Sequence, residues 1–259
     1  MHPFYQTKHE RFSCFSTENI SFPAHLHRSV ELLFVIEGAL EVTVQDQTMI
    51  LNSGGIALIF PDMLHSYQTD AANKVFLCIF NPEYVGDYYN LFRGQQPQVP
   101  FLNSEHLHPD VSLGISRMLE FNQTTPAISE AWLHLILTYL LPNVKLSPLK
   151  RTDNTELTHM LIHYISQHFQ EALTLERIAG DLHFNKYYIS RIFAKKLHCG
   201  FYDYLNRIRL DYAAHLILKS DQKLTGIWQE SGFESQRTFN RAFQKEYGMT
   251  PTEYRKIKP

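Results

Sequence analysis

Between residues 30 and 80, short apolar runs alternate with turn-forming residues. The runs occupy residues 30–36, 40–44, 48–51, 56–60 and 75–80. Gly38, the Asn-Ser-Gly-Gly sequence of residues 52–55 and Pro61 interrupt them. Short strands with turn signals at close spacing predict a β-barrel or a β-sandwich.

Farther along the chain, the pattern changes to helical spacing. Helices are predicted near residues 109–121 and 129–141, and the second has an apolar stripe wide enough for the β-domain and for a partner. Packing within the chain is an equally good explanation of that stripe. Residues 84–101, with two glycines and two prolines, are predicted to be irregular. Residues 142–154 contain two prolines and small polar residues and predict a linker.

The next part of the chain predicts a helix-turn-helix unit. An amphipathic helix over residues 156–169 is followed by a short helix that Thr174 can cap. A turn at residues 183–184 leads to Asn185, the predicted N-cap of a longer helix that ends at Leu197. A short helix, a turn and a longer helix make up this motif.

A second unit follows with the same organisation. Residues 225–231 predict a short helix, Gly232 a turn, and Ser235 the cap of a helix through Tyr247. Between the two units, residues 202–219 predict one continuous helix about 27 Å long. Such a spacer could hold two helices about one DNA turn apart, roughly 34 Å.

The two units are also related in sequence, because residues 189–204 recur at 239–254. Matched positions are Arg191 and Arg241, Phe193 and Phe243, Lys195 and Lys245, and Tyr204 and Tyr254. A repeated short unit indicates an architecture that is built twice. In both longer helices the aromatic positions fall on the face predicted to pack inward.

The opposite helix faces are polar and include Arg191 in the first unit and Arg241 in the second. Their donors and acceptors suit base edges in a major groove. An isolated arginine would more often be a solvated surface residue or an intramolecular ion-pair partner. The recurrence of arginine at equivalent positions of the two units favours DNA contact instead.

Composition supports two domains, since the 259 residues are 44% hydrophobic and so supply enough apolar side chains for two cores. Residues 1–150 contain 8 Lys and Arg against 14 Asp and Glu, a formal charge of −6. Residues 151–259 contain 16 against 12, a charge of +4 that is compatible with a nucleic-acid partner. Three scattered cysteines, no apolar signal segment and no membrane-length apolar run lead us to expect a cytoplasmic protein without a membrane partner.

Residues 231–255 resemble the signature of the AraC/XylS transcription regulators, and the resemblance extends over residues 156–257. It implies promoter DNA, RNA polymerase and a second copy of the chain as partners. It also implies a set of DNA-contacting residues. Base contacts are expected from Tyr187, Ser190, Arg191, Gln236, Arg237, Asn240 and Arg241, and phosphate contacts from Lys186, Lys195 and Lys245.

Polar residues between positions 25 and 65 resemble the two cupin motifs. His25 and His27 are two apart, Glu31 has the same parity, and on a single strand all three would face one side. With His65 they form a set suited to zinc, nickel, iron or manganese. Met63 stands between Pro61 and His65, where the second motif usually has a glycine. We therefore expect these four residues and Tyr67 to contact an effector, and we expect no cofactor. A bound transition metal is the alternative.

The sequence therefore predicts an α+β protein of two domains. Residues 1–145 form a cupin-like, effector-binding β-barrel with dimerisation helices, 146–155 a linker, and 156–259 an all-α domain with two helix-turn-helix units. The expected function is that of an effector-responsive, non-enzymatic transcription regulator. A metal-dependent cupin enzyme is one alternative, which measurable turnover would favour. A constitutive DNA-binding protein with a structural barrel is the other, which an occluded barrel would favour. Activation and repression are both open.

Overall fold

The structure is a computed structural model that describes residues 12–121, 126–149, 153–197 and 199–257. They form two compact units, one rich in β-strands and one that is helical and begins with α4 (Asp153–His168). The protein is therefore α+β with two domains, as the sequence predicts. Within these described ranges, no helix is long and apolar enough to cross a membrane.

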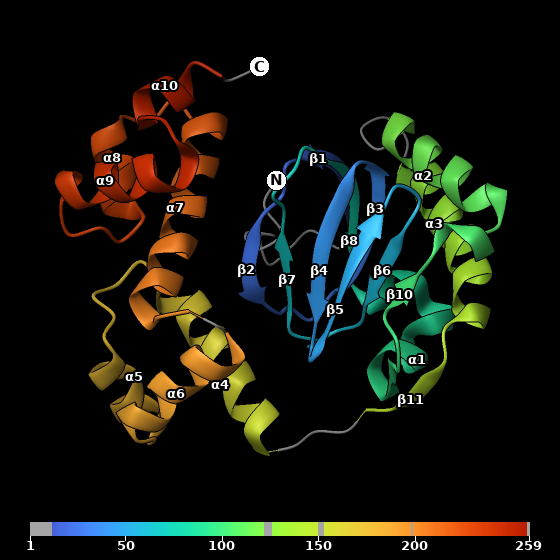
Figure 1. The fold of residues 1–259 in the computed structure, drawn as a ribbon, viewed down its shortest axis with the longest axis horizontal. Helices are drawn as coiled ribbons and strands as arrows, with labels where there is room; N and C mark the ends of the chain where they lie inside the picture. The colour runs from blue at the N-terminus through green and yellow to red at the C-terminus, as the bar shows by residue number, and fades with distance from the viewer. Residues whose placement is uncertain (1–11, 122–125, 150–152, 198, 258–259) are drawn as a thin grey trace. The chain divides into compact units, whose positions relative to one another are not determined.

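The described part of the N-terminal unit contains three antiparallel sheets, two large ones and a pair of short strands (Figure 1). The five-stranded sheet has the order β1 (Phe12–Glu18), β8 (Lys74–Phe80), β3 (Val30–Glu37), β6 (Ile56–Ile59) and β10 (Phe101–Leu102). The four-stranded sheet has the order β2 (Phe22–His25), β7 (His65–Gln68), β4 (Ala39–Val44) and β5 (Gln47–Asn52). The five apolar runs in the sequence correspond to β3, β4, β5, β6 and β8.

Strand β3 lies between β6 and β8, and its first six residues are all buried. A strand buried on both faces has a continuous apolar run rather than an alternating pattern. Its partner β8 is also apolar and buried after Lys74. These two strands form the centre of the core of this unit.

Residues 84–101 are more ordered than the sequence predicts. They include most of a 3₁₀ helix at Pro82–Tyr88, then α1 (Tyr89–Gly94) and β9 (Gln95–Pro97). Strand β9 pairs with β11 (Leu146–Pro148), which lies in the stretch predicted as a linker. The prediction of an irregular segment is wrong. The pairing joins residues about fifty positions apart, and the short strands have no local apolar pattern from which it could be predicted.

Helices α2 (Pro109–Phe121) and α3 (Pro126–Leu140) pack against each other beside the five-stranded sheet (Figure 1). Gly114 allows this close approach, because a Cβ atom there would lie 3.0 Å from the Trp132 ring and 3.1 Å from Ile136. The buried Cys14 thiol of β1 donates to the carbonyl oxygen of Met118 in α2 over 3.7 Å. Both helices therefore belong to the core of the N-terminal unit.

The C-terminal unit contains both predicted helix-turn-helix pairs. The first pair is α5 (Leu175–Leu182) and α6 (Lys186–Lys196), and the second is α8 (Leu224–Glu230) and α9 (Gln236–Tyr247). The predicted caps are confirmed, since the side chains of Thr174, Asn185 and Ser235 each accept a backbone N–H bond. Helix α7 (Phe201–Lys219) joins the pairs, and α10 (Pro251–Arg255) ends the unit.

The sequence repeat produces the same aromatic contact twice. Phe193 in α6 meets Tyr204 in α7 edge-on, with ring centroids 5.5 Å apart. At the repeat-equivalent positions, Phe243 in α9 meets Tyr254 in α10 with centroids 5.3 Å apart. Each longer helix of a pair is therefore held by an aromatic residue from the helix that follows it, and α10 corresponds to the first turn of α7.

Helix α7 and the second pair are also joined to the end of α4. Arg209 is buried, and its guanidinium donates to the carbonyl oxygens of Phe169 and Glu171 over 2.7 Å each. Gly232, in the turn between α8 and α9, has a φ of +82°. A Cβ atom at Gly232 would lie 2.7 Å from the Phe169 carbonyl oxygen and 2.8 Å from the Gln170 Cα atom.

We expect Gly232→Ala to destabilise the helical unit by about 2–3 kcal/mol, because alanine would be strained at this φ and would press on the backbone after α4. Urea unfolding of the full chain, followed by circular dichroism, measures this loss.

Gly248→Ala is the matched control, since Gly248 has a φ of +69° but, apart from the glycine itself and its two chain neighbours, no heavy atom of the described residues lies within 4 Å of the position that a Cβ atom would take there. It should cost only the conformational strain, about 1–2 kcal/mol. Equal losses in the two variants would mean that the close approach at Gly232 contributes nothing.

Candidate nucleic-acid interface and histidine cluster

Helix α6 separates a buried face from an exposed face. Ile189, Ile192 and Phe193 are at most 4% exposed and pack into the unit. The opposite face exposes the predicted contacts Lys186, Tyr187, Ser190, Arg191 and Lys195. Tyr187 is the most exposed large hydrophobic residue of this helix, at 74%.

Helix α9 repeats the arrangement. Phe239 and Phe243 are buried, at 1% and 0% exposure. The exposed face contains the other predicted contacts, Gln236, Arg237, Asn240, Arg241 and Lys245. The structure thus places all ten predicted contact residues on exposed helix faces, five on each helix.

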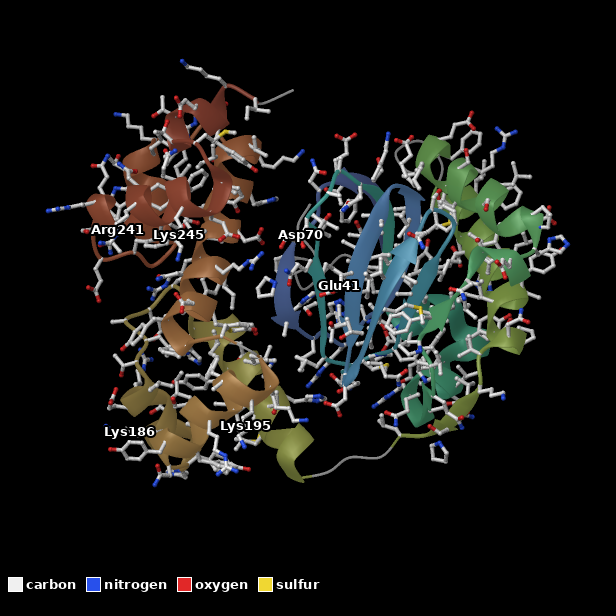
Figure 2. All side chains as sticks on the ribbon, viewed as in Figure 1. Glu41, Asp70, Lys186, Lys195, Arg241 and Lys245 are labelled. Atoms are coloured by element: carbon white, nitrogen blue, oxygen red, sulfur yellow. The ribbon has the colours of Figure 1, made fainter. Side chains whose placement is uncertain are left out.

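Most of the basic groups on these faces are available to a ligand. Within the described residues, the structure records no hydrogen bond or ion pair for the side chains of Arg191, Lys195, Arg237, Arg241 and Lys245. Figure 2 labels two cations on each helix: Arg241 and Lys245 on α9, and Lys186 and Lys195 on α6. Exposed cations without acidic neighbours keep their full charge for a polyanion.

Two outward side chains are engaged instead. The Lys186 ammonium lies 3.2 Å from the Glu176 carboxylate, and this ion pair neutralises part of its charge. The same ammonium lies over the Tyr187 ring. Solvent screens an exposed ion pair of this kind and leaves it weak, so a phosphate can compete for Lys186. Gln244 donates to the Gly248 carbonyl oxygen over 2.9 Å and closes the end of α9.

In the N-terminal unit, the structure brings the four predicted polar residues together. His25 ends β2 and lies directly opposite His65, the first residue of β7. Glu31 is the second residue of β3, in the other sheet. The prediction that His25, His27 and Glu31 share one strand is wrong, because β2 ends at His25 and His27 lies in the connection to β3. The chain turns here, and the cluster forms across two sheets.

Backbone carbonyl groups orient all three imidazole rings. The Nδ1 atoms of His25, His27 and His65 lie 2.9, 3.0 and 2.8 Å from the carbonyl oxygens of Pro23, Ser29 and Met63. Since a carbonyl oxygen can only accept, each Nδ1 must carry the proton. The three Nε2 atoms therefore face the centre of the cluster. No side-chain pattern in the sequence signals these carbonyl partners, and the sequence analysis missed them.

Glu31 is the acceptor at the centre. Its carboxylate lies 2.9 Å from His27 Nε2 and 3.5 Å from His65 Nε2. The Tyr67 hydroxyl donates to the other carboxylate oxygen over 2.5 Å. Tyr67, the fifth residue predicted to contact an effector, thus contacts the cluster through Glu31.

The cluster is buried except at one edge. His25, Glu31 and His65 are at most 1% exposed, whereas the His27 side chain is 18% exposed. Burial alone would raise the pKa of the Glu31 carboxyl, but His27 and His65 outweigh it and hold the pKa well below its usual range. Burial, reinforced by His65, lowers the pKa of His25, and burial beside Glu31 raises the pKa of Tyr67.

The donor atoms of His25, His27, Glu31 and His65 all lie within 4.8 Å of one another. Three imidazole nitrogens and a carboxylate can hold a divalent transition metal, or they can form hydrogen bonds with a polar small molecule.

Family comparisons place a known domain on each unit. Residues 14–137 match the AraC-like ligand binding domain, and residues 178–257 match a helix-turn-helix domain. These two domains, together with relatives named as transcriptional regulators, assign the chain to the AraC family.

Curated relatives agree with this class. The chain is 23% identical to the probable transcriptional regulator LumQ of Photobacterium leiognathi, over 89% of this chain and 90% of LumQ. It is 23% identical to an HTH-type transcriptional regulator of Staphylococcus aureus over 87% of this chain. The match covers 31% of that relative, so the chain spans about a third of its length.

Solved structures share the fold. ToxT from Vibrio cholerae superposes over 96% of this chain and 98% of its own length, with a TM-score of 0.63 and 14% identity. Another ToxT structure, with an unsaturated fatty acid bound, has a TM-score of 0.57 and 14% identity. At these identities, the comparison establishes the fold alone.

Arg191→Ala and Arg241→Ala should each weaken specific DNA binding by about 1–3 kcal/mol, because each removes a potential bidentate base contact. Lys195→Ala should weaken specific and random DNA alike and flatten the salt dependence, as expected for a phosphate contact. Fluorescence anisotropy against a selected DNA site and a scrambled duplex, at several salt concentrations, separates the two effects.

Arg93→Ala is the matched control, since Arg93 is an exposed arginine of α1 in the other unit and donates to the Tyr89 hydroxyl over 2.6 Å. It should leave DNA binding unchanged. Wild-type affinity in both Arg191→Ala and Arg241→Ala would exclude these helix faces as the base-reading surface.

Proposed function

We propose that this chain is a sequence-specific DNA-binding regulator whose two longer helices, α6 and α9, enter successive major grooves of promoter DNA. One observation supports this most strongly. The two repeat-related helices expose equivalent arginine and lysine side chains that have no partner among the described residues. A packing or scaffold role would give no reason for Arg191 and Arg241 to stay unpaired at equivalent positions.

The length of α7 supports binding to two grooves. Its 19 residues extend over about 28 Å. Successive major grooves on one side of B-DNA are about 34 Å apart. Since the Phe193–Tyr204 and Phe243–Tyr254 contacts attach the two longer helices to the helices that follow them, α7 is a rigid spacer of suitable length.

The N-terminal unit is proposed to bind a small polar effector at the histidine cluster. The match to an AraC-like ligand binding domain supports an effector in this unit. The ToxT structure with a bound fatty acid supports the view that this fold accepts small molecules. The lining of His25, His27, Glu31, His65 and Tyr67 is polar, and we therefore propose a compound with hydrogen-bonding groups rather than an acyl chain.

Further parts of the proposal concern partners. We propose a homodimer that forms through α2 and α3, contact with RNA polymerase at the promoter, and action in the cytoplasm, where promoter DNA lies. Exposed apolar residues on these helices, Leu113 at 47% and Ile128 at 36%, support the dimer. The two family matches, to a ligand-binding domain and to a helix-turn-helix domain, support a regulator without catalysis.

A fragment of residues 150–259 tests the division of labour. It retains α4 to α10, so it should fold as a monomer, select the same DNA sequence as the full chain and bind it more weakly. It should not respond to effector, because an effector acts only through different affinities for two states and the fragment lacks the proposed binding unit.

DNA selected from a random duplex library by each protein provides the site, and candidate metabolites are then titrated into both complexes. If the full chain selects no sequence over random DNA, the proposed function is wrong. If the fragment keeps an effector response, the N-terminal unit is not the sensor.

A further inference from the structure

Two cysteines from distant parts of the sequence lie directly opposite each other in the five-stranded sheet. Cys14 is in β1 and Cys78 is in β8, and the strand register pairs them. Residues paired in this way have their side chains on the same face of the sheet. Both cysteines are buried, at 1% and 0% exposure, and neither belongs to a disulfide. Folding therefore brings two thiols together in the core of the N-terminal unit.

The hydrogen-bond pattern puts this pair at a site suited to a disulfide. In an antiparallel sheet, hydrogen-bonded and non-hydrogen-bonded pairs alternate along the strands. Just beyond the paired ends of β1 and β8, the Asn19 N–H donates to the Asn73 carbonyl oxygen over 3.0 Å. Since the register of the two strands is unbroken, Cys14 and Cys78 form a non-hydrogen-bonded pair. The Cα atoms of such a pair are about 4.5 Å apart, within the range of about 4.4–6.8 Å that disulfides bridge.

A neutral disulfide fits this environment better than a pair of thiolates. Burial raises the pKa of the Cys14 thiol to about 12 and the pKa of the Cys78 thiol well above its ordinary value. Thiolates around a metal ion would place charges in an apolar sheet, whereas a disulfide carries no charge. In the strand on its other side, Cys78 is paired with Leu32, which has no reactive group. The site therefore favours two-electron oxidation of the two thiols.

The same burial protects the thiols while the sheet is closed, because the thiolate is the reactive form of cysteine. Strand β1, however, is at the edge of its sheet and pairs only with β8 among the described residues. The contact of the Cys14 thiol with the Met118 carbonyl oxygen of α2 is long, at 3.7 Å, and weak. Local opening of an edge strand costs less than opening of the core strands. Opening of β1 therefore exposes Cys14, and pairing again returns it to Cys78.

We propose that Cys14 and Cys78 are a dithiol that hydrogen peroxide oxidises when β1 opens, and that the resulting disulfide fastens β1 to β8. The Cys14 thiolate first attacks one peroxide oxygen and becomes a sulfenic acid, while the hydroxide that leaves takes up the proton lost by the thiol. After β1 pairs again, the Cys78 sulfur attacks the Cys14 sulfur and expels a second hydroxide, which takes the Cys78 proton. Two thiols and one peroxide thus give one disulfide and two waters.

The disulfide would enclose the histidine cluster, because His25, Glu31 and His65 all lie between Cys14 and Cys78 in the chain. A cross-link between the ends of this stretch limits how far it can open. Transient disulfides of cytosolic proteins commonly serve redox sensing. Any effect of the disulfide on effector or DNA affinity rests on the proposed function, whereas its formation does not.

The test treats the reduced full chain with hydrogen peroxide, denatures it, alkylates the remaining thiols and maps the peptides by mass spectrometry. We expect a cross-linked peptide that joins Cys14 to Cys78 and that dithiothreitol releases. The melting temperature of the cross-linked chain should rise by about 5 °C, because the disulfide closes a long loop. A chain without this cross-linked peptide would overturn the proposal, and an unchanged melting temperature would show that the disulfide does not fasten β1.

Cys199→Ser is the matched control, since Cys199 belongs to the helical unit and the variant should form the disulfide at the wild-type rate. Cys14→Ala and Cys78→Ala should each lose the cross-link and the melting shift. Circular dichroism establishes whether these variants fold, and if they do not, the peptide map of the wild type decides. A melting shift that persists in either folded variant would overturn the assignment to this pair.

Phe12→Ala tests the role of strand opening. The Phe12 ring stacks on the Tyr84 ring with centroids 5.0 Å apart, at the start of β1. Losing this aromatic contact should increase the rate of disulfide formation by about 2- to 10-fold. Ile50→Ala is the control, since Ile50 is 62% exposed on β5 of the other large sheet and the variant should react at the wild-type rate. A wild-type rate in Phe12→Ala would exclude opening of β1 as the gate.

DNA selection is measured separately on the reduced chain. A chain that forms the disulfide without selecting DNA would contradict the proposed function alone. A chain that selects DNA and forms no disulfide between Cys14 and Cys78 would contradict this inference alone.

Discussion

The contact between an aromatic residue of each longer helix and a tyrosine of the following helix is the constraint on which the DNA-binding unit depends. Phe193 against Tyr204 and Phe243 against Tyr254 anchor α6 and α9 in the same way. Because one side of each helix is held by these rings, the opposite side must face solvent. The sequence repeat contains both the inward aromatic residues and the outward arginines. When the aromatic contact fixes the rotation of a longer helix about its axis, the arginine on the opposite face is directed to solvent.

The N-terminal unit has a different organising feature. Its sheets are built from apolar strands, yet two buried histidines, the partly exposed His27 and a buried glutamate occupy the end where β2, β3 and β7 meet. Buried polar groups cost free energy unless they are paired, and among the described residues His65 Nε2 makes no hydrogen bond. A polar effector could supply that hydrogen bond.

The sequence predicted the histidine cluster correctly but for a partly incorrect reason. Strand parity suggested that His25, His27 and Glu31 lie on one face of one strand. In the structure they meet because the chain turns after β2 and enters the other sheet at Val30. The spacing in the sequence is compatible with both geometries, and only the strand pairing distinguishes them. The Nδ1 hydrogen bonds to backbone carbonyls also depend on that turn.

By itself, the sequence determined the elements whose signals are local. Apolar periodicity, the caps at Thr174, Asn185 and Ser235 and the repeat of residues 189–204 specify both helix-turn-helix pairs, because each signal acts within a few residues of the backbone it stabilises. The tertiary structure alone decided the β9–β11 pairing, the approach of Gly232 to the end of α4 and the orientation of the imidazole rings. Each of these depends on contacts between residues brought together by folding, which no local pattern encodes.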